Sequence, residues 1–375
     1  MAVPITRLHA NATESLARPT EYEYLFALEP AALVQHFLAD PPQDFTAQTL
    51  PDGTPAFRAR FDLLTTADAS LRRRAQALPG RRLLRRLLEP MTLFVGSTVS
   101  EYLPLGSEAA ARQLPALLRS QHIHAQAFTI IKDIPAQSPL LDARQNRIAQ
   151  QLCEAAQAAD FVLLEGQALA HLPLDFASMD AWLARFSAKR RYDIRRKLKQ
   201  RERLHVETWP LGCAALRDAA LRQTLYALYL QVYAQSDVHF DCLTPAFFDA
   251  VFTDDRLPGF LFVFRQQDRI IGWKLCFEHA GMLIDKYVGF SYPEAREFGL
   301  FFVSWAECLD YALRRGLRHY VAGWTDPEVK AYLGAGFTMT RHAVYARNRL
   351  IRAGLRRFAH WFESDGRRIG ARDGT

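Results

Sequence analysis

The second half of the chain contains one ordered series of strand and helix patterns, and this order constrains the fold more than any other feature. Short runs of β-branched and aromatic residues between turn residues predict strands, and longer segments with apolar residues at helical spacing predict helices. The predicted strands are 205–210, 260–265, 270–278, 282–290, 317–324 and a last one from Phe337. The predicted helices are 214–235, 244–252, 300–315 and a short one before Phe337.

The connections between these segments predict how the strands pair. Gln267-Asp268 and His279-Ala-Gly281 are tight turns, so the three strands between 260 and 290 form an antiparallel meander. The helix 300–315 that follows is long enough for a crossover to a parallel neighbour. We therefore expect a mixed α/β sheet, antiparallel first and parallel later, whose strands splay apart where the two parts meet.

Length and composition are typical of a folded enzyme. The chain has 375 residues, enough for one or two domains with apolar cores. No run approaches the roughly eighteen apolar residues of a membrane span, and the N-terminus lacks a signal-peptide pattern. The five scattered cysteines show no metal-ligand spacing, so we expect reduced thiols, no metal site and a cytoplasmic location.

Basic residues are in excess and are clustered. The formal net charge is +7, and arginines gather at 185–203 and again at 349–372. Clustered arginines bind phosphates, so CoA, tRNA and lipid headgroups are natural partners; a genome rich in G and C is an alternative explanation of the arginine content. The basic, amphipathic segment from 349 onward either packs on the core or contacts an anionic membrane surface, which would place the protein at the inner membrane face.

The most basic segment, 187–203, predicts a helix. In a helix, Tyr192, Arg195, Arg196 and Lys199 share one face, and Ser187 caps the start. No zinc motif and no interleaved aromatic pattern accompanies the charge, so we expect no stable DNA partner. The segment is either a solvated helix between two domains or a surface that binds an anionic substrate. In the second case the candidate contacts are Lys189, Arg190, Arg195 and Arg196.

The order of elements and the pattern Ser-x-Lys-Arg-x-x-x-x-Arg-Arg-Lys from Ser187 resemble the Fem-like, double-domain branch of the acyl-CoA N-acyltransferase (GNAT) superfamily. That branch includes peptidoglycan interpeptide-bridge enzymes. The resemblance implies two tandem copies of the acyl-CoA N-acyltransferase fold, the N-terminal one degenerate. The implied parts are a degenerate lobe at 1–186, a linker helix at 187–203, the acyltransferase domain at 204–348 and a basic helix and tail at 349–375. In the first lobe the candidate strands are 93–95, 127–132 and 161–164, and the candidate helices are 114–118 and 147–158.

One motif implied by the resemblance concerns the donor. Arg296-Glu-Phe-Gly299-Leu300 resembles the turn with which these enzymes hold the CoA pyrophosphate. Backbone N–H groups and the positive end of the following helix attract an anion there. The resemblance thus implies acyl-CoA as co-substrate, with Arg296, Gly299 and Leu300 as its contacts.

A second motif concerns the reacting groups. Tyr332 stands four residues before Gly336-Phe337, where the superfamily has a tyrosine that protonates the leaving thiolate. A core tyrosine is the alternative. Lys330 and Gly334 match a Lys-x-x-x-Gly element of the Fem-like branch, in which the lysine faces the substrate.

Charged residues also lie on the predicted central strands, where charge is costly unless it is paired or faces a wet cleft. Strand alternation places Asp285 and Tyr287 on one face and Lys286 on the other, with Lys274 across the hairpin. A substrate cleft explains these charges, and a salt bridge facing the edge is the alternative. We expect Asp285 to accept the proton of an attacking ammonium, with Glu278 as second candidate, and Lys274, Lys286 and Tyr287 to contact the substrate.

Three functions remain open at this point. The first is an acyltransferase that moves an acyl group from CoA to an amine of a small molecule or peptide by direct attack in a ternary complex. The second keeps the fold but takes the acyl group from aminoacyl-tRNA, as Fem peptidyltransferases do; Phe301, which replaces a small residue of the CoA turn, and the basic helix favour it. The third is a non-catalytic module that binds polyanions or lipids.

Overall fold

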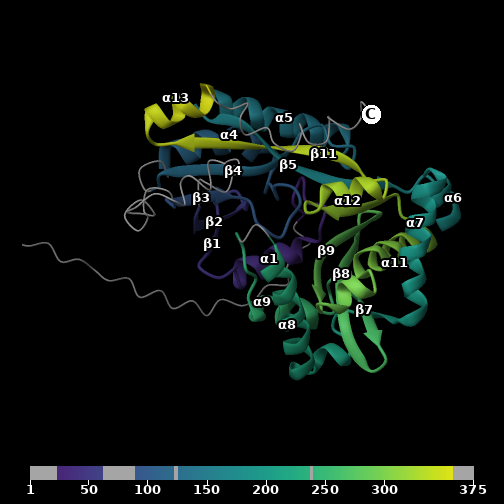
Figure 1. Cartoon of the computed structure of the whole chain (residues 1–375). Coiled ribbons are helices and arrows are strands. Elements are labelled where there is room, and N and C mark those ends of the chain that lie inside the picture. The colour runs from purple at the N-terminus through teal and green to yellow at the C-terminus, as the bar shows by residue number, and fades with distance from the viewer. Residues whose placement is uncertain (1–22, 62–88, 122–125, 237–239, 358–375) are drawn as a thin grey trace, which may run out of the picture.

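A computed structural model describes residues 23–61, 89–121, 126–236 and 240–357 (Figure 1). The tail 358–375, with three of the seven arginines of the second cluster, and residues 1–22 of the expected first lobe lie outside the described residues. All strands of the described part form one sheet of eleven, in the order β1-β2-β3-β4-β11-β5-β10-β9-β8-β7-β6.

The first half supplies five strands and the second half six. The strands are β1 (Thr46–Thr49), β2 (Pro55–Arg60), β3 (Met91–Val95), β4 (Phe128–Pro135), β5 (Val162–Pro173), β6 (His205–Pro210), β7 (Gly259–Gln266), β8 (Arg269–His279), β9 (Met282–Phe290), β10 (His319–Gly323) and β11 (Gly336–Ala346). The helices are α1 (Ala31–Ala39), α4 (Glu108–Gln121), α5 (Ala143–Ala158), α6 (Met179–Ala184), α7 (Ala188–Leu198), α8 (Ala219–Gln235), α9 (Pro245–Thr253), α10 (Glu294–Glu297), α11 (Leu300–Arg314), α12 (Pro327–Tyr332) and α13 (Arg349–Arg357).

The predicted elements of both halves are confirmed. Strands β6 and β9 begin and end where the sequence pattern places them, and most other strands differ by a few residues at their ends. Strand β5 is the exception, because it continues to Pro173, nine residues beyond the predicted end at 164. The basic segment forms α7 with Ser187 as its N-cap, followed by the 3-10 helix Lys199–Arg203. Local patterns suffice for these elements because each has clear turn or cap residues at its ends.

The two halves exchange their last strands. Each half has a parallel pair with a helix between its strands, β3–β4 with α4 and β9–β10 with α11. Strand β11 of the second half pairs with β4 of the first, and β5 of the first half pairs with β10 of the second. Strands β5 and β11 also pair with each other. The sheet is therefore continuous across both halves, whereas the sequence predicted β10 and β11 as parts of a sheet built by the second half.

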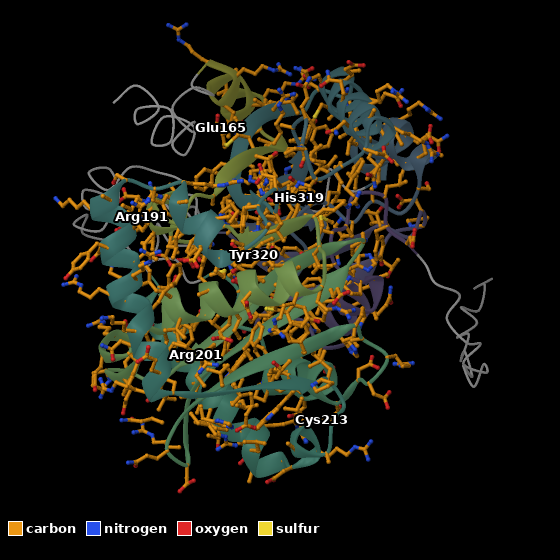
Figure 2. All side chains as sticks on the ribbon, turned by 90° about the vertical axis from the view of Figure 1, so that its right-hand side faces the viewer. Glu165, Arg191, Arg201, Cys213, His319 and Tyr320 are labelled. Carbon is orange, nitrogen blue, oxygen red and sulfur yellow. The ribbon has the colours of Figure 1, made fainter. Side chains whose placement is uncertain are left out.

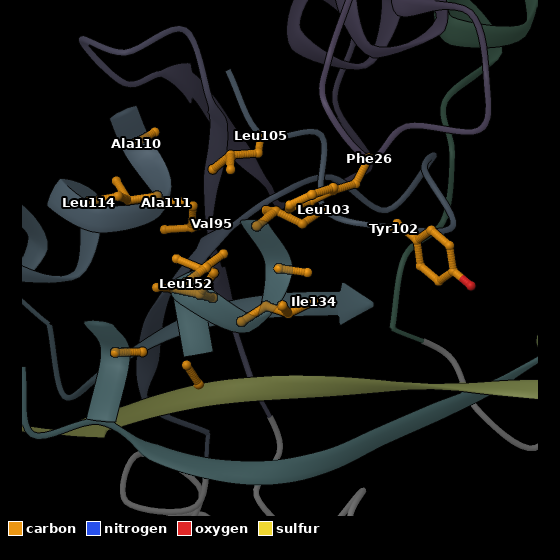
Figure 3. Packing of buried hydrophobic residues seen from close by; sticks show 14 of the residues in the cluster. Phe26, Val95, Tyr102, Leu103, Leu105, Ala110, Ala111, Leu114, Ile134 and Leu152 are labelled. Atoms are coloured by element: carbon orange, nitrogen blue, oxygen red, sulfur yellow. The ribbon is translucent and has the colours of Figure 1, made fainter. Parts of the chain in front are cut away.

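In the first half, a loop fills the space beside the parallel pair. The ladder between β3 and β4 ends at Val95 and Ile131. Beyond it, the backbone N–H of Leu103 donates to the carbonyl of Asp133 on β4, at 3.0 Å. Tyr102 and Leu103 are fully buried there, in the apolar cluster that Figure 3 shows. The corresponding space in the second half has no such loop across its strands among the described residues.

Three apolar clusters hold the layers together. The first lies between the sheet and α4 and α5, and the third lies beneath α11, with residues of α6 and α7. The second contains residues of α1, α8 and α9 together with strands of both halves, so one core spans the exchanged sheet. Burial of this apolar area is the main stabilising contribution.

A fragment of residues 204–375 should fail to fold on its own. It lacks β5, so β10 would lose its antiparallel neighbour and β11 would lose both of its neighbours, leaving long unpaired edges. Circular dichroism and size-exclusion chromatography of the fragment, alone and co-expressed with residues 1–203, test this. Co-expression should restore a soluble complex, and a monodisperse, cooperatively unfolding fragment 204–375 would contradict the prediction.

Candidate functional site at the splay of the sheet

Strands β9 and β10 separate near the middle of the sheet. Their parallel ladder ends at Ile284 and Val321, although β9 continues beyond it. Gly323, the last residue of β10, has a φ of 78°, and a Cβ there would lie 3.9 Å from the Asp285 carbonyl oxygen and 3.8 Å from Lys330 Nζ. Only glycine adopts this backbone readily. The residues around this opening, which we call the splay site, are Lys274, Asp285, Lys286, Tyr320 and Lys330.

A β-bulge at Lys286 shapes the splay site. Tyr287 pairs with Leu275, but Asp285 pairs with the next residue, Cys276, so Lys286 is left without a cross-strand partner. One extra residue reverses the alternation of side chains. Asp285 therefore lies on the face beneath α11 with Cys276, whereas Tyr287 packs against α8 and α9. The expectation that Asp285 and Tyr287 share a face is wrong, because simple alternation takes no account of a bulge.

Asp285 is held by two donors. Lys274 Nζ and the Tyr320 hydroxyl both donate to its Oδ2, at 2.6 and 2.8 Å. Burial would lower the pKa of Lys274, but the adjacent Asp285 carboxylate outweighs it, and the pKa stays above its ordinary value. Figure 2 shows Tyr320 in the interior of the molecule. Lys274 and Asp285 thus form an ion pair, which was the alternative to a substrate cleft, although this pair lies inside the protein and not at an edge. Their contact with a substrate stays a prediction.

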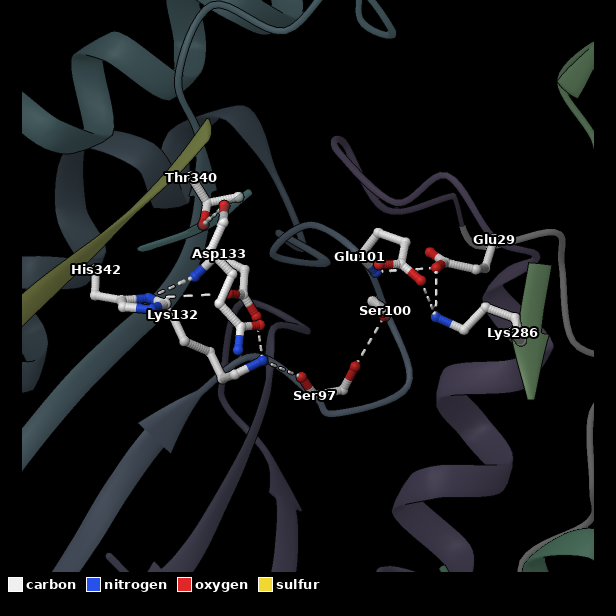
Figure 4. Close-up of polar contacts among 10 residues, drawn as sticks. Glu29, Ser97, Ser100, Glu101, Lys132, Asp133, Lys286, Thr340 and His342 are labelled. Carbon is white, nitrogen blue, oxygen red and sulfur yellow. Dashed lines mark hydrogen bonds and ion pairs between the residues drawn. The ribbon is translucent and has the colours of Figure 1, made fainter. Parts of the chain in front are cut away.

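Lys286 points toward the first half of the chain. Its Nζ donates to Glu29 at 2.9 Å and to Glu101 at 2.6 Å (Figure 4). Both glutamates are fully buried, one just before α1 and one in the loop after β3. Burial raises the pKa of Glu101, the Lys286 charge opposes this and the Glu29 charge adds to it. Sequence analysis missed both glutamates because nothing near them in the sequence marks them as buried.

Lys330, on α12, is buried without a partner. The residue is 4% exposed. Among the described residues, its ammonium forms no hydrogen bond and no ion pair. Burial lowers its pKa to about 8, while the charges of Asp285 and Glu101 act in the opposite direction. The contact of Lys330 with a substrate stays a prediction.

Glu278, the second candidate base, lies away from this opening. It pairs with Leu283, at the other end of β8. Its carboxylate accepts hydrogen bonds from Arg315 and from the Tyr311 hydroxyl, each at 3.0 Å. The hydrogen bond from Arg315 lowers its pKa, which makes the carboxylate a weaker base. Of the two candidate bases, only Asp285 lies at the splay site, and the choice between them stays a prediction.

Tyr332 lies at the contact between α12 and α7. Its hydroxyl donates to Asp193 Oδ2 at 2.9 Å, and Arg190 and Lys197 lie over its ring. Burial and the Asp193 carboxylate raise its pKa. Arg190 also donates to the carbonyls of Ala331 and Tyr332. Arg190 therefore holds the end of α12 in place, a role that the sequence did not predict for it.

The outer face of α7 is basic and exposed. Lys189 is exposed, Arg195 pairs with Asp180 and Arg196 pairs with Asp193 in surface ion pairs. The side chain of Tyr192 is 72% exposed on the same helix. Surface ion pairs of this kind contribute little stability. Lys189, Arg195 and Arg196 are therefore accessible to an anionic ligand.

The predicted donor turn precedes α11. Gly299 is the N-cap with a φ of 57°, and a Cβ there would meet no atom within 4 Å. Arg296 is near it and donates to Gln235 at 3.0 Å. Leu300 is fully buried, so only its backbone N–H could meet a ligand. The Phe301 ring stacks near Trp305 at 6.5 Å between centroids.

Two further observations concern metals and membranes. Within the described ranges, no group of three or more His, Cys, Asp or Glu side chains could hold a metal ion. None of the helices in these ranges combines the length and the apolar character that crossing a membrane requires.

Comparison with known proteins decides the family. Residues 114–364, two thirds of the chain, match the FemAB-like family, described as peptidoglycan biosynthesis/recognition. The chain belongs to the FemAB-like family. A search of curated proteins finds no match. The family supports an acyltransferase-type role, which includes the Fem peptidyltransferase kind.

Solved structures show the fold of this FemAB-like protein. It is similar to the C-terminal domain of a putative lysylphosphatidylglycerol synthetase from Agrobacterium fabrum, at 14% identity and a TM-score of 0.53, over 86% of this chain and 88% of that one. It is also similar to L-PGS from Bacillus licheniformis, at 9% identity and a TM-score of 0.52, over 90% and 98%. FemX is similar at 12% identity and a TM-score of 0.45, over 87% and 98%. The two structures with TM-scores above 0.5 cover most of this chain, so the chain shares their overall fold.

Lys330→Met should raise the free energy of unfolding at pH 7 by on the order of 1–3 kcal/mol, because it removes a buried ammonium that has no ion-pair partner among the described residues. Between the folded pKa of about 8 and the ordinary value of 10.5, the unfolded chain binds more protons than the folded one. As the pH rises through this window, the free energy of unfolding of the wild type should therefore increase relative to that of the variant. Urea unfolding of both proteins at several pH values tests this, with exposed Lys199→Met as control. A variant less stable than wild type at pH 7 would contradict it.

Proposed function

We propose that this FemAB-like protein transfers an acyl group from CoA to an amine at the splay site, within the half 204–348. The observation that carries the proposal is Lys330, a buried lysine beside the point where β9 and β10 separate, whose ammonium forms no hydrogen bond or ion pair with the described residues. A buried cation at this place is destabilising unless a ligand uses it. A developing oxyanion is such a ligand.

The donor is acyl-CoA in this proposal. Its pyrophosphate would meet the N-terminus of α11, where Gly299 leaves the approach open and Leu300 offers a backbone N–H. The first turn of a helix has N–H groups without intrahelical partners, and its positive end favours an anion. Arg296 adds a positive charge next to this turn. The thin acyl arm would then run into the opening between β9 and β10.

The proposed step is a direct attack on the thioester. A bond forms between the amine nitrogen and the acyl carbon, and the bond from that carbon to sulfur breaks. The charge of Lys330 stabilises the oxygen of the tetrahedral intermediate, and Asp285 takes the proton from the nitrogen. Tyr332 can give a proton to the leaving thiolate only after its hydroxyl breaks the hydrogen bond to Asp193. Tyr332 therefore contributes less to the rate than Asp285 does.

A Fem-type reaction with aminoacyl-tRNA is the second candidate. The exposed, basic face of α7, with Tyr192 among its arginines, favours it, because exposed aromatic rings stack on bases and arginines bind phosphates. In this reaction the bond that breaks joins the acyl carbon to the ester oxygen of the tRNA, instead of to the thioester sulfur of CoA. Either donor is a cytoplasmic molecule, so we propose the cytoplasm as the site of the reaction.

Purified protein incubated with an amine mixture and either acetyl-CoA, longer acyl-CoAs or charged tRNA tests the proposal. Release of CoA that depends on the amine is the expected result. Release of deacylated tRNA alone would replace the proposal by the Fem-type reaction, and release of neither would refute both.

Asp285→Asn should lower turnover by about 10²–10⁴-fold, the usual contribution of a general base, and should leave donor affinity unchanged. Steady-state kinetics with the active donor, together with calorimetry of donor binding, measure the two effects. Glu278→Gln serves as the comparison and should change turnover less. Full turnover in Asp285→Asn, with chemistry shown to be rate-limiting, would exclude Asp285 as the base.

Arg296→Ala should weaken CoA binding by about 1–3 kcal/mol, the range for a hydrogen bond to a charged group. Calorimetric titration with CoA measures this, and Arg269→Ala, which removes an exposed arginine of β8, is the matched control. Equal affinity of wild type and Arg296→Ala for CoA would contradict the assignment of the donor turn.

A further inference from the structure

Helix α13 packs against the rest of the protein with one side only. Arg352 is buried, donates to the Ala346 carbonyl at 2.7 Å and pairs with Asp160 at 2.8 Å. Arg356 also donates to Asp160, and Leu355 packs on the second apolar cluster. Packing on the core, one of the two alternatives for the segment from 349, is therefore present, but it uses only part of the helix surface.

The other side of α13 is apolar and exposed. Leu350 is 83% exposed, and the next residue, Ile351, is 46% exposed. Side chains two positions apart in a helix do not face each other, so Leu350 points away from the buried Arg352. Single exposed apolar residues are normal, but a group of them on one surface indicates contact with another molecule or a membrane.

Such a group lies at one edge of the sheet. The paired residues Thr92, Phe128 and Ala346 join the starts of β3 and β4 to the end of β11, which leads to α13. Helices α4 and α5 return to this edge, because each ends before the next strand begins there (Figure 1). Met91 and Leu117, each 42% exposed, lie toward the same edge. It thus holds four of the six large apolar residues that are exposed in the described part of the chain.

The same edge is basic. Arg119 near the end of α4, and Arg349 and Arg357 on α13, are exposed, and none of them forms an ion pair within the described ranges. Arg119 is close enough to influence the charge of Asp160, so α4 and α13 meet there. Asp160 itself is already paired with two arginines of α13. The remaining positive charge attracts anions to this edge.

A shallow groove opens between α4 and α5 beside these arginines. Its volume is about 650 Å³, and its lining comprises Arg112, Arg119, Ser120 and alanines of both helices. The Arg112 side chain is 59% exposed. Guanidinium groups and a hydroxyl are suitable donors to phosphate oxygens. The groove therefore has the chemistry of a site for a phosphate headgroup.

We propose that this edge, formed by the C-terminal ends of α4 and α5 and the exposed side of α13, binds the surface of a membrane that contains anionic phospholipids. Leu350 and Ile351 enter the boundary between headgroups and acyl chains, and the arginines contact the phosphates. Amphipathic basic helices bind membrane surfaces in this way. The inference goes beyond the proposed function and does not depend on it, because the edge includes no residue of the splay site.

The combination of apolar and basic groups favours a bilayer over other partners. A nucleic acid would bind the arginines but would leave Leu350 and Ile351 in water. In a symmetric dimer the same surface of two copies meets, so the unpaired arginines of both would be brought together. A bilayer with anionic lipids supplies negative charge and an apolar layer at once.

Sedimentation of the full chain with large vesicles tests the proposal. Vesicles of phosphatidylcholine and phosphatidylglycerol in equal parts are compared with vesicles of phosphatidylcholine alone. Wild type should bind the anionic vesicles at least about tenfold more tightly, because several arginines each gain from the surface charge. Added salt should weaken this binding, since it screens exposed charges.

Two double variants separate the apolar from the charged contribution. Leu350→Ser with Ile351→Ser should weaken binding to the anionic vesicles by about tenfold or more, because less apolar area then leaves water. Arg349→Gln with Arg357→Gln should weaken it by about tenfold as well, because two charges near the lipid surface are lost.

Matched controls lie elsewhere on the surface. Leu230→Ser removes an exposed leucine of α8, and Arg314→Gln removes an exposed arginine of α11. Both should bind anionic vesicles like wild type. Thermal unfolding establishes that each variant is folded.

Several outcomes would overturn the inference. They are no binding to anionic vesicles, equal binding to both kinds of vesicle, and unchanged binding in both double variants of α13. Binding of RNA without binding of vesicles would make a nucleic acid the partner instead. A dimer that dissociates in Leu350→Ser with Ile351→Ser, without vesicle binding, would make a second copy the partner. If vesicles are bound as expected and no donor is consumed, only the proposed function fails.

Discussion

The exchange of β5 and β11 between the two halves is the constraint on which the rest of the structure depends. Strand β5 lies between β10 and β11 of the second half, and β11 lies between β4 and β5 of the first half. Neither half can therefore complete its sheet alone. Backbone N–H and C=O groups in the middle of a sheet need partners on both sides. The exchange also brings the segment before α1 and the loop after β3 to the face of β9, where Glu29 and Glu101 meet Lys286.

A single extra residue in β9 then sets the chemistry of the centre. Without the bulge at Lys286, Asp285 and Tyr287 would point to the same side of the sheet. With it, Asp285 joins Lys274 and Tyr320 beneath α11, and Lys286 reaches the first half. The ladder between β9 and β10 ends at the same level, which opens the sheet beside these charges. One local change of register thus places Asp285 with Lys274 on one side of the sheet and directs the neighbouring Lys286 to the glutamates of the first half.

These buried charges are a cost to stability. Lys274 with Asp285, and Lys286 with two glutamates, are desolvated, and buried ion pairs seldom stabilise a fold more than apolar residues of the same size would. Lys330 has no hydrogen-bond or ion-pair partner in the part of the chain that the structure describes. Proteins tolerate such arrangements where activity requires them, and the apolar clusters on both faces of the sheet supply the stability that offsets them. The concentration of cost at one place is the physical reason for treating the splay as the functional centre.

The sequence by itself determined most secondary structure, the mixed character of the sheet and the family. Turn residues, caps and periodicity are local, so β6, β9, α7 and α11 could be predicted from neighbouring residues. It also singled out Lys274, Asp285, Lys286 and Lys330, because charged residues within predicted interior strands and a family motif can be recognised from the sequence. Only the tertiary structure decided their partners. The strand exchange, the bulge and the approach of Glu29 and Glu101 depend on contacts between residues far apart in the chain, whose pairing no local pattern encodes.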